Sequence, residues 1–293
     1  MPTTVSNTQN ETLNNRAILI TGCSSGIGLS VAHGLRKRGY FVIASARKPH
    51  DVALLQTEGF TALQLDLADS SSIRAAVDET LRITSGRLFA VFNNGAYGQP
   101  GAVEDLTRDV LRQQFETNLF GTMELTNLLI PALRKQGYGR IVQNSSVLGL
   151  VTLPYRGAYN ASKFALEGIS DTLRQELTGT GIFVSLIEPG PIESRFRENA
   201  FAAYQKNITT DASAHRDTYL NMEHRLQKVG PAAPFTLPPE AVLKKVIHAL
   251  ESARPKPRYY VTFPTYLLGT LRRIFSTRLL DKVLLKVSGD ENK

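Results

Sequence analysis

Seven short apolar runs, rich in Val, Ile and Phe, recur along the chain and alternate with segments of helical period. Strands that are apolar throughout are expected where helices cover both faces of a parallel sheet. We predict strands over residues 17–21, 40–45, 61–66, 88–93, 140–145, 183–188 and 258–262, and helices over residues 29–38, 71–84, 108–136 and 158–178. This order predicts an α/β fold: a doubly wound, parallel, seven-stranded sheet with helices on both faces.

Length and composition favour one large domain. Of the 293 residues, 1–14 are predicted to be a disordered N-terminal tail, 15–262 the domain, and 263–293 a basic amphipathic C-terminal extension with helical period. A long irregular stretch, about 190–239, follows the sixth predicted strand. Ligand-binding loops of such folds lie there, so we predict that this stretch is the substrate loop.

Composition also excludes several classes of protein. The single cysteine, Cys23, cannot form an intramolecular disulfide, the N-terminus lacks the pattern of a signal peptide, and no apolar run approaches the ~20 residues of a membrane-spanning helix. We therefore expect a cytoplasmic protein. Residues 241–293 carry 11 Lys and Arg against 4 Asp and Glu, whereas residues 1–240 carry 23 against 22. The nearly neutral body has no nucleic-acid-binding motif, and the five histidines have no metal-ligand spacing, so neither nucleic acid nor metal is expected.

Residues 22–26 read GCSSG, which fits the G-x-S-x-G nucleophile elbow of serine hydrolases. A hydrolase elbow normally follows an upstream loop that supplies an oxyanion-hole N–H, and here only the first strand precedes it. The spacing continues to Gly28, and three glycines would let the backbone approach a pyrophosphate at a helix N-terminus. By itself the motif leaves a structural turn, a nucleotide-binding loop and a hydrolase elbow open.

A Tyr and a Lys begin the helix that is predicted after the fifth strand. Ser146 precedes Tyr159 by 13 residues, and Lys163 follows it by four. Residues at i and i+4 share a helix face, so the ammonium group lies near the phenol. The spacing alone also fits a surface pair, but this helix starts at the carboxyl ends of the strands, where ligands of open α/β sheets bind.

These pieces, in this order, resemble the short-chain dehydrogenase/reductase family over about residues 15–262. The matching pieces are Thr21-Gly22-x3-Gly26-Ile27-Gly28, Asp66-Leu67, Asn93-Asn94-Gly95, Asn118, Ser146, Tyr159-x3-Lys163 and Pro189-Gly190. Three segments and the basic tail resemble bacterial NADP-dependent aldehyde or carbonyl reductases related to retinol and 17β-hydroxysteroid dehydrogenases. The segments read SARKP, ASKFALEG and SLIEPGPI. The resemblance implies a Rossmann-type fold and makes Ser24 a cofactor contact rather than a nucleophile.

The resemblance also implies catalytic roles. Tyr159 is the general acid or base, Lys163 favours its phenolate and binds the nicotinamide ribose, and Ser146 donates to the substrate oxygen. Asn118 would hold a water that links Lys163 to solvent. From the residues alone, a helix-kink position beside Gly121 is the alternative for Asn118.

The cofactor contacts that the resemblance implies are Gly22, Ser24, Ser25, Gly26, Ile27, Gly28, Arg47, Lys48, Asp66, Leu67, Asn93, Gly95, Tyr159, Lys163, Pro189, Gly190, Ile192 and Ser194. Asp66 would bind the adenine, although a helix cap also explains it. Two departures from the family pattern occur: Gly95-Ala96 replaces the usual Ala-Gly, and Ser194 stands where Thr is common.

The end of the second strand indicates the cofactor. NAD enzymes place an acidic side chain there for the ribose 2′-hydroxyl, whereas a nearby Arg accommodates the 2′-phosphate of NADP. Here Ala46 occupies that position, and Arg47 and Lys48 follow. We predict NADP(H), with a solvated basic turn as the alternative.

The leading hypothesis is an NADP(H)-dependent oxidoreductase acting on CH–OH groups, which reduces an apolar aldehyde or ketone or runs the reverse reaction. A retinol or hydroxysteroid dehydrogenase is a related alternative, and a non-catalytic NADP-binding regulator is a remote one, since such relatives usually lose the Tyr or the Lys. The family often pairs through the helices that carry Asn118 and Tyr159, so we expect a homo-oligomer.

The tail, residues 264–288, has apolar residues at helical spacing on both sides of a break at residues 276–277. Basic residues lie at the margins of these apolar sets: Arg272, Arg273, Arg278, Lys282 and Lys286. The two short helices either fold back over the substrate cleft or a subunit contact, or form a monotopic anchor on anionic lipid at the inner face of the membrane.

Overall fold

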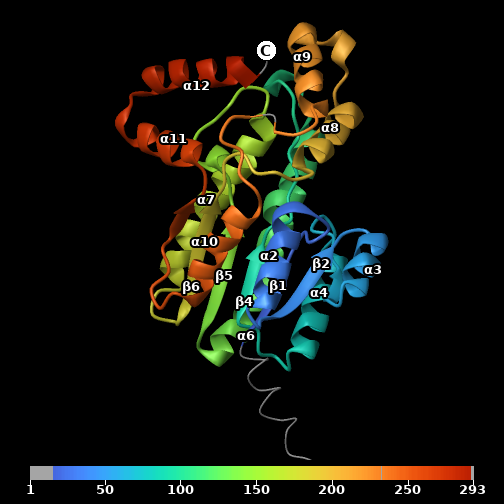
Figure 1. Cartoon of the computed structure of the whole chain (residues 1–293), viewed down its shortest axis with the longest axis vertical. Coiled ribbons are helices and arrows are strands. Elements are labelled where there is room, and N and C mark those ends of the chain that lie inside the picture. Colours follow the sequence, from blue (N-terminus) through green and yellow to red (C-terminus); the bar gives the residue numbers. More distant parts are fainter. Residues whose placement is uncertain (1–15, 232, 292–293) are drawn as a thin grey trace, which may run out of the picture.

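The computed structural model describes residues 16–231 and 233–291. Its centre is one parallel sheet of seven strands (Figure 1). The strands are β1 (Ala17–Ile20), β2 (Phe41–Ala46), β3 (Thr61–Gln64), β4 (Ala90–Asn93), β5 (Gly139–Asn144), β6 (Ile182–Glu188) and β7 (Arg258–Tyr260). Their order is β3-β2-β1-β4-β5-β6-β7, so the direction of winding reverses between β1 and β4. This confirms the predicted doubly wound fold and places a ligand crevice at the carboxyl ends of these strands.

Helices cover both faces of the sheet. On one face, α2 (Gly26–Lys37) and α10 (Glu240–Glu251) bury Leu35 and Val246 against β1 and β2. On the other, α4 (Ser70–Ile83), α6 (Gly121–Gln136) and α7 (Gly157–Glu176) bury residues such as Val77, Leu129 and Leu173. A further short helix, α3 (Pro49–Thr57), follows β2. Neither α3 nor α10 was predicted.

The helix predicted over residues 108–136 is interrupted. It consists of α5 (Arg108–Phe115), a π-helical turn η2 (Glu116–Phe120) and α6. At Gly121 the chain runs so close to the neighbouring loop that a Cβ would lie 1.7 Å from the carbonyl oxygen of Leu67. The π turn is therefore set by close backbone packing, and turns of this kind often occur at functional sites.

The stretch 190–239, predicted to be irregular, contains α8 (Phe196–Asn207), the single turn η4 (Thr210–Ala212) and α9 (Arg216–Gln227). These helices are rich in charged residues, so the sequence shows little helical periodicity of apolar residues. Tyr204 and Tyr219 pack on Leu106 and Val110 in a satellite core. The helices α8 and α9 thus form a cap at the same end of the molecule as the C-terminal helices (Figure 1).

The tail forms α11 (Phe263–Ile274) and α12 (Thr277–Glu291), so the break falls at residues 275–276, one residue before the predicted position. Leu268, Leu280 and Leu284 pack on Leu148 and Leu153 in the segment between β5 and α7. The tail therefore folds back on the body. In the described part of the chain, we find no helix with the length and apolar content needed to span a membrane. The tail predicted over residues 1–14 lies outside the described residues.

Candidate active site

The turn between β1 and α2 requires its glycines. Gly22 and Gly26 have φ of +71° and +57°, in the left-handed region. A Cβ on Gly28 would lie only 2.2 Å from the carbonyl oxygen of Gly22. Ser24 is exposed, and the Ser25 hydroxyl makes no capping bond to α2. The turn therefore offers the backbone N–H groups of a helix N-terminus to a ligand.

An asparagine network supports this turn. The Thr21 hydroxyl accepts hydrogen bonds from the N–H groups of Asn94 (2.9 Å) and Gly95 (2.8 Å). The Asn94 amide donates to the Thr21 carbonyl and accepts from Asn144 Nδ2, each at 2.9 Å. The ends of β1, β4 and β5 are thereby tied together, with Gly95-Ala96 in reversed order from the family pattern. Sequence reasoning gave no role to Thr21 or Asn144.

The structure brings the four predicted catalytic residues to one place. Lys163 is buried, donates a hydrogen bond of 2.7 Å to the Asn144 carbonyl, and has its Nζ 5.6 Å from the centre of the Tyr159 ring. The Ser146 hydroxyl lies beside the Tyr159 hydroxyl and acts to lower its pKa. Ser146 in turn caps the single turn η3 (Val147–Gly149) by accepting from Leu148 N at 3.1 Å.

Asn118 joins this group through the π turn. Its Nδ2 donates to the Tyr97 carbonyl (2.9 Å) and to the Ser162 hydroxyl (3.1 Å), and its Oδ1 accepts from Tyr97 N (3.1 Å). Ser162 is the residue before Lys163 on α7. Asn118 therefore lies at a helix irregularity, as the simpler interpretation had it, and also bridges to the helix that carries the catalytic pair.

Burial changes the acidity of the Tyr–Lys pair. Burial raises the pKa of Tyr159 to about 12, and the neighbouring Ser146 hydroxyl acts in the opposite direction. Burial lowers the pKa of Lys163 to about 8, and the negative charge of Glu167 acts against this. Near neutral pH the phenol therefore holds its proton and the amine is mainly charged.

The residues at the ends of β2 and β3 are available for a ligand. Arg47 and Lys48 are exposed. Asp66 accepts a bond from Ala68 N (3.0 Å), whereas the cap of α4 is Asp69, which accepts from the backbone N–H groups of its first turn. The alternative interpretation of Asp66 as a helix cap is therefore wrong. Leu67 is buried and its side chain lies beside Gly95.

The Asn93 side chain instead points into the protein. It is buried, and its Nδ2 donates to the Thr126 hydroxyl at 2.8 Å. Its side chain therefore ties β4 to α6.

The segment after β6 lies over the glycine turn. A Cβ on Gly26 would be 2.8 Å from Ser194 Cβ, and Pro189 accepts a hydrogen bond of 2.8 Å from Val147 N. Gly190 packs so closely on Thr262 that a Cβ would lie 2.2 Å from its hydroxyl oxygen. Ile192 pairs with Leu237 in an isolated bridge. Of the predicted cofactor residues after β6, Ser194 therefore lies directly against the glycine turn.

Phe196 is a site residue that sequence reasoning missed. Its ring packs edge-on against Tyr159, with 5.3 Å between centroids. A Cβ on Gly98 would lie 2.7 Å from Phe196 Cζ, so the glycine leaves room for this ring. A single Phe in the charged segment RFREN gives no signal for such a contact.

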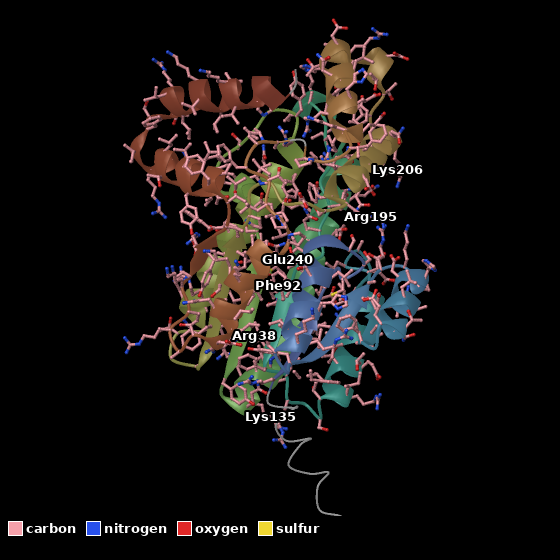
Figure 2. All side chains as sticks on the ribbon, viewed as in Figure 1. Arg38, Phe92, Lys135, Arg195, Lys206 and Glu240 are labelled. Carbon is pink, nitrogen blue, oxygen red and sulfur yellow. The ribbon has the colours of Figure 1, made fainter. Side chains whose placement is uncertain are left out.

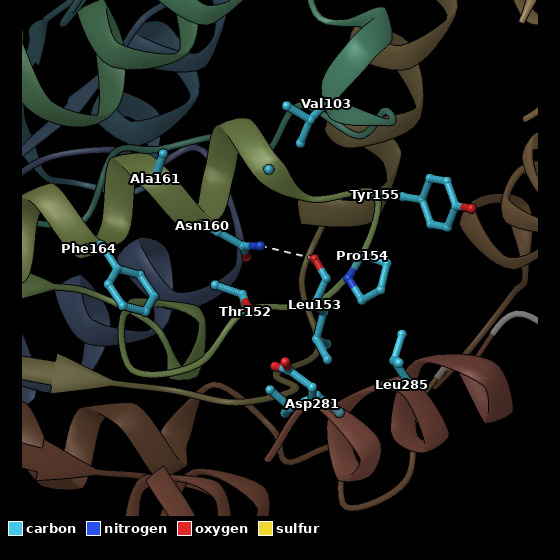
Figure 3. Close-up of a pocket in the computed structure, with 12 residues that line it drawn as sticks. Val103, Thr152, Leu153, Pro154, Tyr155, Asn160, Ala161, Phe164, Asp281 and Leu285 are labelled. Atoms are coloured by element: carbon cyan, nitrogen blue, oxygen red, sulfur yellow. Dashed lines mark hydrogen bonds between the residues drawn. The ribbon is translucent and has the colours of Figure 1, made fainter. Parts of the chain in front are cut away.

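A pocket of about 620 Å³ lies between α7, the segment before it and α12 (Figure 3). Its lining is mainly apolar and includes Leu153, Phe164, Leu284 and Leu285, with Asp281 at its edge. Asn160, which donates to the Leu153 carbonyl at 2.9 Å, also lines it. The α7 residues of the pocket project from a different side of the helix than Tyr159 and Lys163. Leu153 and Leu284 of the pocket nevertheless belong to the apolar cluster against which Tyr159 packs.

Among the residues that the structure describes, no group of three or more His, Cys, Asp or Glu side chains could hold a metal ion. The crevice has two features that could act on a ligand, the Tyr–Lys–Ser group and the glycine turn. A doubly wound sheet with these two features at its carboxyl edge defines a nucleotide-dependent oxidoreductase.

Comparison with known proteins agrees with this class. The family model described as short chain dehydrogenase matches residues 16–205. The chain belongs to this family. The solved structure of a short-chain dehydrogenase from Streptomyces avermitilis is similar with a TM-score of 0.70 and 25% identity, over 92% of this chain and 93% of that one.

Three relatives are similar over most of their length. An uncharacterized oxidoreductase, YbbO of Escherichia coli, is 45% identical over 92% of this chain and 94% of its own. An NADPH-dependent 3-dehydrocapnine reductase of Ornithobacterium rhinotracheale is 31% identical over 92% and 96%. Human 17-beta-hydroxysteroid dehydrogenase type 1 is 33% identical over 84% and 77%.

Proposed function

We propose that this oxidoreductase uses NADP(H) to reduce an apolar aldehyde or ketone, with Tyr159 as the proton donor. The observation that carries the proposal is the position of Tyr159 between Ser146 and Lys163, beside a glycine turn at the carboxyl edge of the sheet. A phenol whose pKa is raised to about 12 holds a proton at neutral pH and gives it up only to a strongly basic atom such as a forming alkoxide.

The residues present fit a dinucleotide. The crowding at Gly28, where a Cβ would lie 2.2 Å from a carbonyl oxygen, keeps the backbone of the turn open to a pyrophosphate. Arg47 and Lys48 would hold a 2′-phosphate, since the preceding Ala46 is buried and supplies no carboxylate to a 2′-hydroxyl. The relative from Ornithobacterium rhinotracheale is named an NADPH-dependent 3-dehydrocapnine reductase, which also supports NADP(H) as the cofactor.

When bound, the nicotinamide supplies the hydride. The chain's own residues then manage the oxygen of the substrate. Ser146 donates a hydrogen bond to the carbonyl oxygen, and Tyr159 transfers its phenolic proton to that oxygen as negative charge develops. The Lys163 ammonium stabilises the phenolate that remains, and Asn118 holds a water through which the proton is replaced from solvent.

The substrate is proposed to be apolar because the walls near Tyr159 are apolar. Phe196 lies on its ring, and Leu148 and Val151 belong to the cluster against which Tyr159 packs. A retinol or hydroxysteroid dehydrogenase is the related alternative, which the similarity to a 17-beta-hydroxysteroid dehydrogenase favours. Assays of aldehydes, retinoids and steroids with NADPH and with NADH decide between them. No turnover of any of these would favour a non-catalytic NADP-binding regulator.

We also propose that the protein is cytoplasmic and self-associates. Phe120, Phe164 and Ile169 are exposed apolar residues on η2 and α7, the region through which the family often pairs. Light scattering of the full chain and of Phe164→Glu tests this, because the variant should lower the measured mass if the region is an interface.

The outer side of α11 and α12 is proposed to contact anionic lipid. Phe263, Leu267 and Ile274 are exposed, and they recur at i, i+4 and i+11 on the side of α11 away from buried Leu268. On α12, Arg278, Lys282 and Lys286 repeat every four residues and are exposed. The inner faces of both helices are proposed to cover the segment between β5 and α7 as a lid. The lid and the lipid contact therefore use opposite sides of the same helices.

A further inference from the structure

A cluster of buried charged groups lies beside the catalytic residues. Glu188, at the end of β6, has no exposed surface, and Glu167 on α7 is also buried. Arg258 of β7 pairs with both: its Nε is 3.2 Å from Glu188 Oε1, and its Nη2 is 3.0 Å from Glu167 Oε2. The same Nη2 is 2.6 Å from Asp171 Oδ2. One guanidinium therefore serves three carboxyl groups.

Asp171 also pairs with Arg174 at 2.9 Å, whereas Glu167 and Glu188 share the single guanidinium of Arg258. Arg258 holds both acids, since its Nη2 and Nε lie 3.0 Å and 3.2 Å from oxygens of Glu167 and Glu188, so the two buried carboxyl groups lie beside each other. Among the described residues, Glu167 Oε1 and Glu188 Oε2 are buried and have no hydrogen-bond partner. Two adjacent buried carboxylates repel, and a single proton between them removes the repulsion and supplies the missing donor.

The surroundings decide which acid carries that proton. Burial, and then the charge of Glu167, raise the pKa of Glu188 to about 9. Burial also raises the pKa of Glu167, but the Ser145 hydroxyl and Arg258 both act to lower it. Glu188 is therefore the protonated partner at neutral pH, and Glu167 is the anion.

The pair contacts the segments that carry the site. Glu167 follows Lys163 by one turn on the same side of α7 and acts to raise its pKa. A Cβ on Gly149 would lie 3.2 Å from Glu167 Oε1, so this carboxylate abuts the turn that Ser146 caps. Glu188 directly precedes Pro189 in the chain.

We propose that Glu188 and Glu167 form a hydrogen-bonded acid pair with one proton, in which Glu188 is the donor, and that the Glu167 anion is a positioning residue that keeps Lys163 charged. This inference rests on the proposed role of Lys163. The other ionisable groups that face the pair are Asp171 on α7, Arg258 and Tyr260 on β7, and Arg273 on α11.

The two acids should respond differently to amide substitution. Glu188→Gln keeps a donor toward Glu167, so its pH profile of kcat should match that of the wild type. Glu167→Gln removes the charge beside Lys163, so the alkaline limb of the kcat profile should move down by about one pH unit. Asp171→Asn is the matched control, since it also removes a carboxylate from Arg258 but lies two turns from Lys163, and it should leave the profile unchanged.

Infrared spectroscopy of the full chain tests the proton without any turnover. The wild type should show the carbonyl band of a protonated buried carboxyl at neutral pH, and Glu188→Gln should lack it. Absence of that band in the wild type, or equal shifts of the kcat profile in Glu188→Gln and Glu167→Gln, would overturn the proposal. Because the band does not depend on catalysis, an inactive protein that shows it would contradict the proposed function and not the acid pair.

Discussion

The ring of Phe196 meets the ring of Tyr159 edge-on, at 5.3 Å between centroids, and thereby places the start of α8 against the proposed proton donor. Phe196 comes from the cap and Tyr159 from the body of the domain. An apolar substrate that reaches the phenol must therefore contact or displace this ring. The cap is for this reason expected to contribute to substrate selection.

Replacing Phe196 with Ala should raise KM for bulky apolar carbonyls more than it lowers kcat. The variant removes an apolar wall but leaves Ser146, Tyr159 and Lys163 in place. Steady-state kinetics on a small and a bulky aldehyde measure the effect, with Phe201→Ala on the same helix as the control. A selective loss of kcat with KM unchanged would contradict a role in substrate contact.

Replacing Tyr159 with Phe should lower kcat by roughly 10²–10⁴-fold, the usual value of general acid catalysis. The ring and its packing remain, so binding of NADPH, followed by its fluorescence, should be retained. Tyr155→Phe is a matched control in the same segment. If Tyr159→Phe kept most of the activity on an accepted carbonyl, the assignment of the proton donor would be wrong.

The sequence predicted the strands because most are short runs dominated by apolar residues, such as AILI in β1 and AVFN in β4. It predicted the catalytic group because the Tyr–Lys spacing is local. The π turn at Asn118 follows from the close approach of Gly121 to Leu67, and such a long-range contact leaves no local pattern. The contact of Phe196 with Tyr159 and the pairing of Glu167 with Glu188 depend in the same way on tertiary packing. The short helix α3 was missed because nine residues beginning with Pro49 show little periodicity.

Replacing Arg47 with Ala should lower kcat/KM for NADPH while leaving kcat/KM for NADH nearly unchanged. The expected loss is roughly tenfold or more, since a charge-assisted contact to phosphate contributes about 1.5–3 kcal/mol. Lys48→Ala should have the smaller effect. Equal kcat/KM values for the two cofactors in the wild type would contradict the predicted preference for NADP(H).

The buried Lys163 makes stability depend on pH. Its pKa is lowered from 10.5 to about 8 on folding, so the folded state binds fewer protons than the unfolded state between these values. This group therefore costs stability below pH 8, and that cost declines as the pH rises toward 10.5. Lys163→Met should be inactive. Near neutral pH it should gain the most stability relative to the wild type, and this gain should shrink at higher pH. Urea unfolding at several pH values measures this. A pH-independent difference would argue against a depressed pKa.

The lipid contact of the tail is best tested with point variants. Truncation after Phe263 would remove α11 and α12 and uncover Leu148 and Val151 beside the site, so loss of binding would be confounded by a damaged fold. Lys282→Glu and Leu267→Ser change only exposed side chains. Lys135→Glu is the matched charge control, since Lys135 lies at the opposite end of the molecule from α12 (Figure 2).

The wild type should co-sediment with vesicles that contain phosphatidylserine and remain in the supernatant with phosphatidylcholine alone. Each basic residue near an anionic surface contributes about 1 kcal/mol, so Lys282→Glu should weaken binding by roughly fivefold or more, and added salt should act in the same direction. Leu267→Ser should weaken it through loss of apolar burial, whereas Lys135→Glu should have no effect. If the wild type stays in the supernatant with both lipids, the outer side of α11 and α12 has no lipid role, and the tail serves only as the lid that its inner faces form.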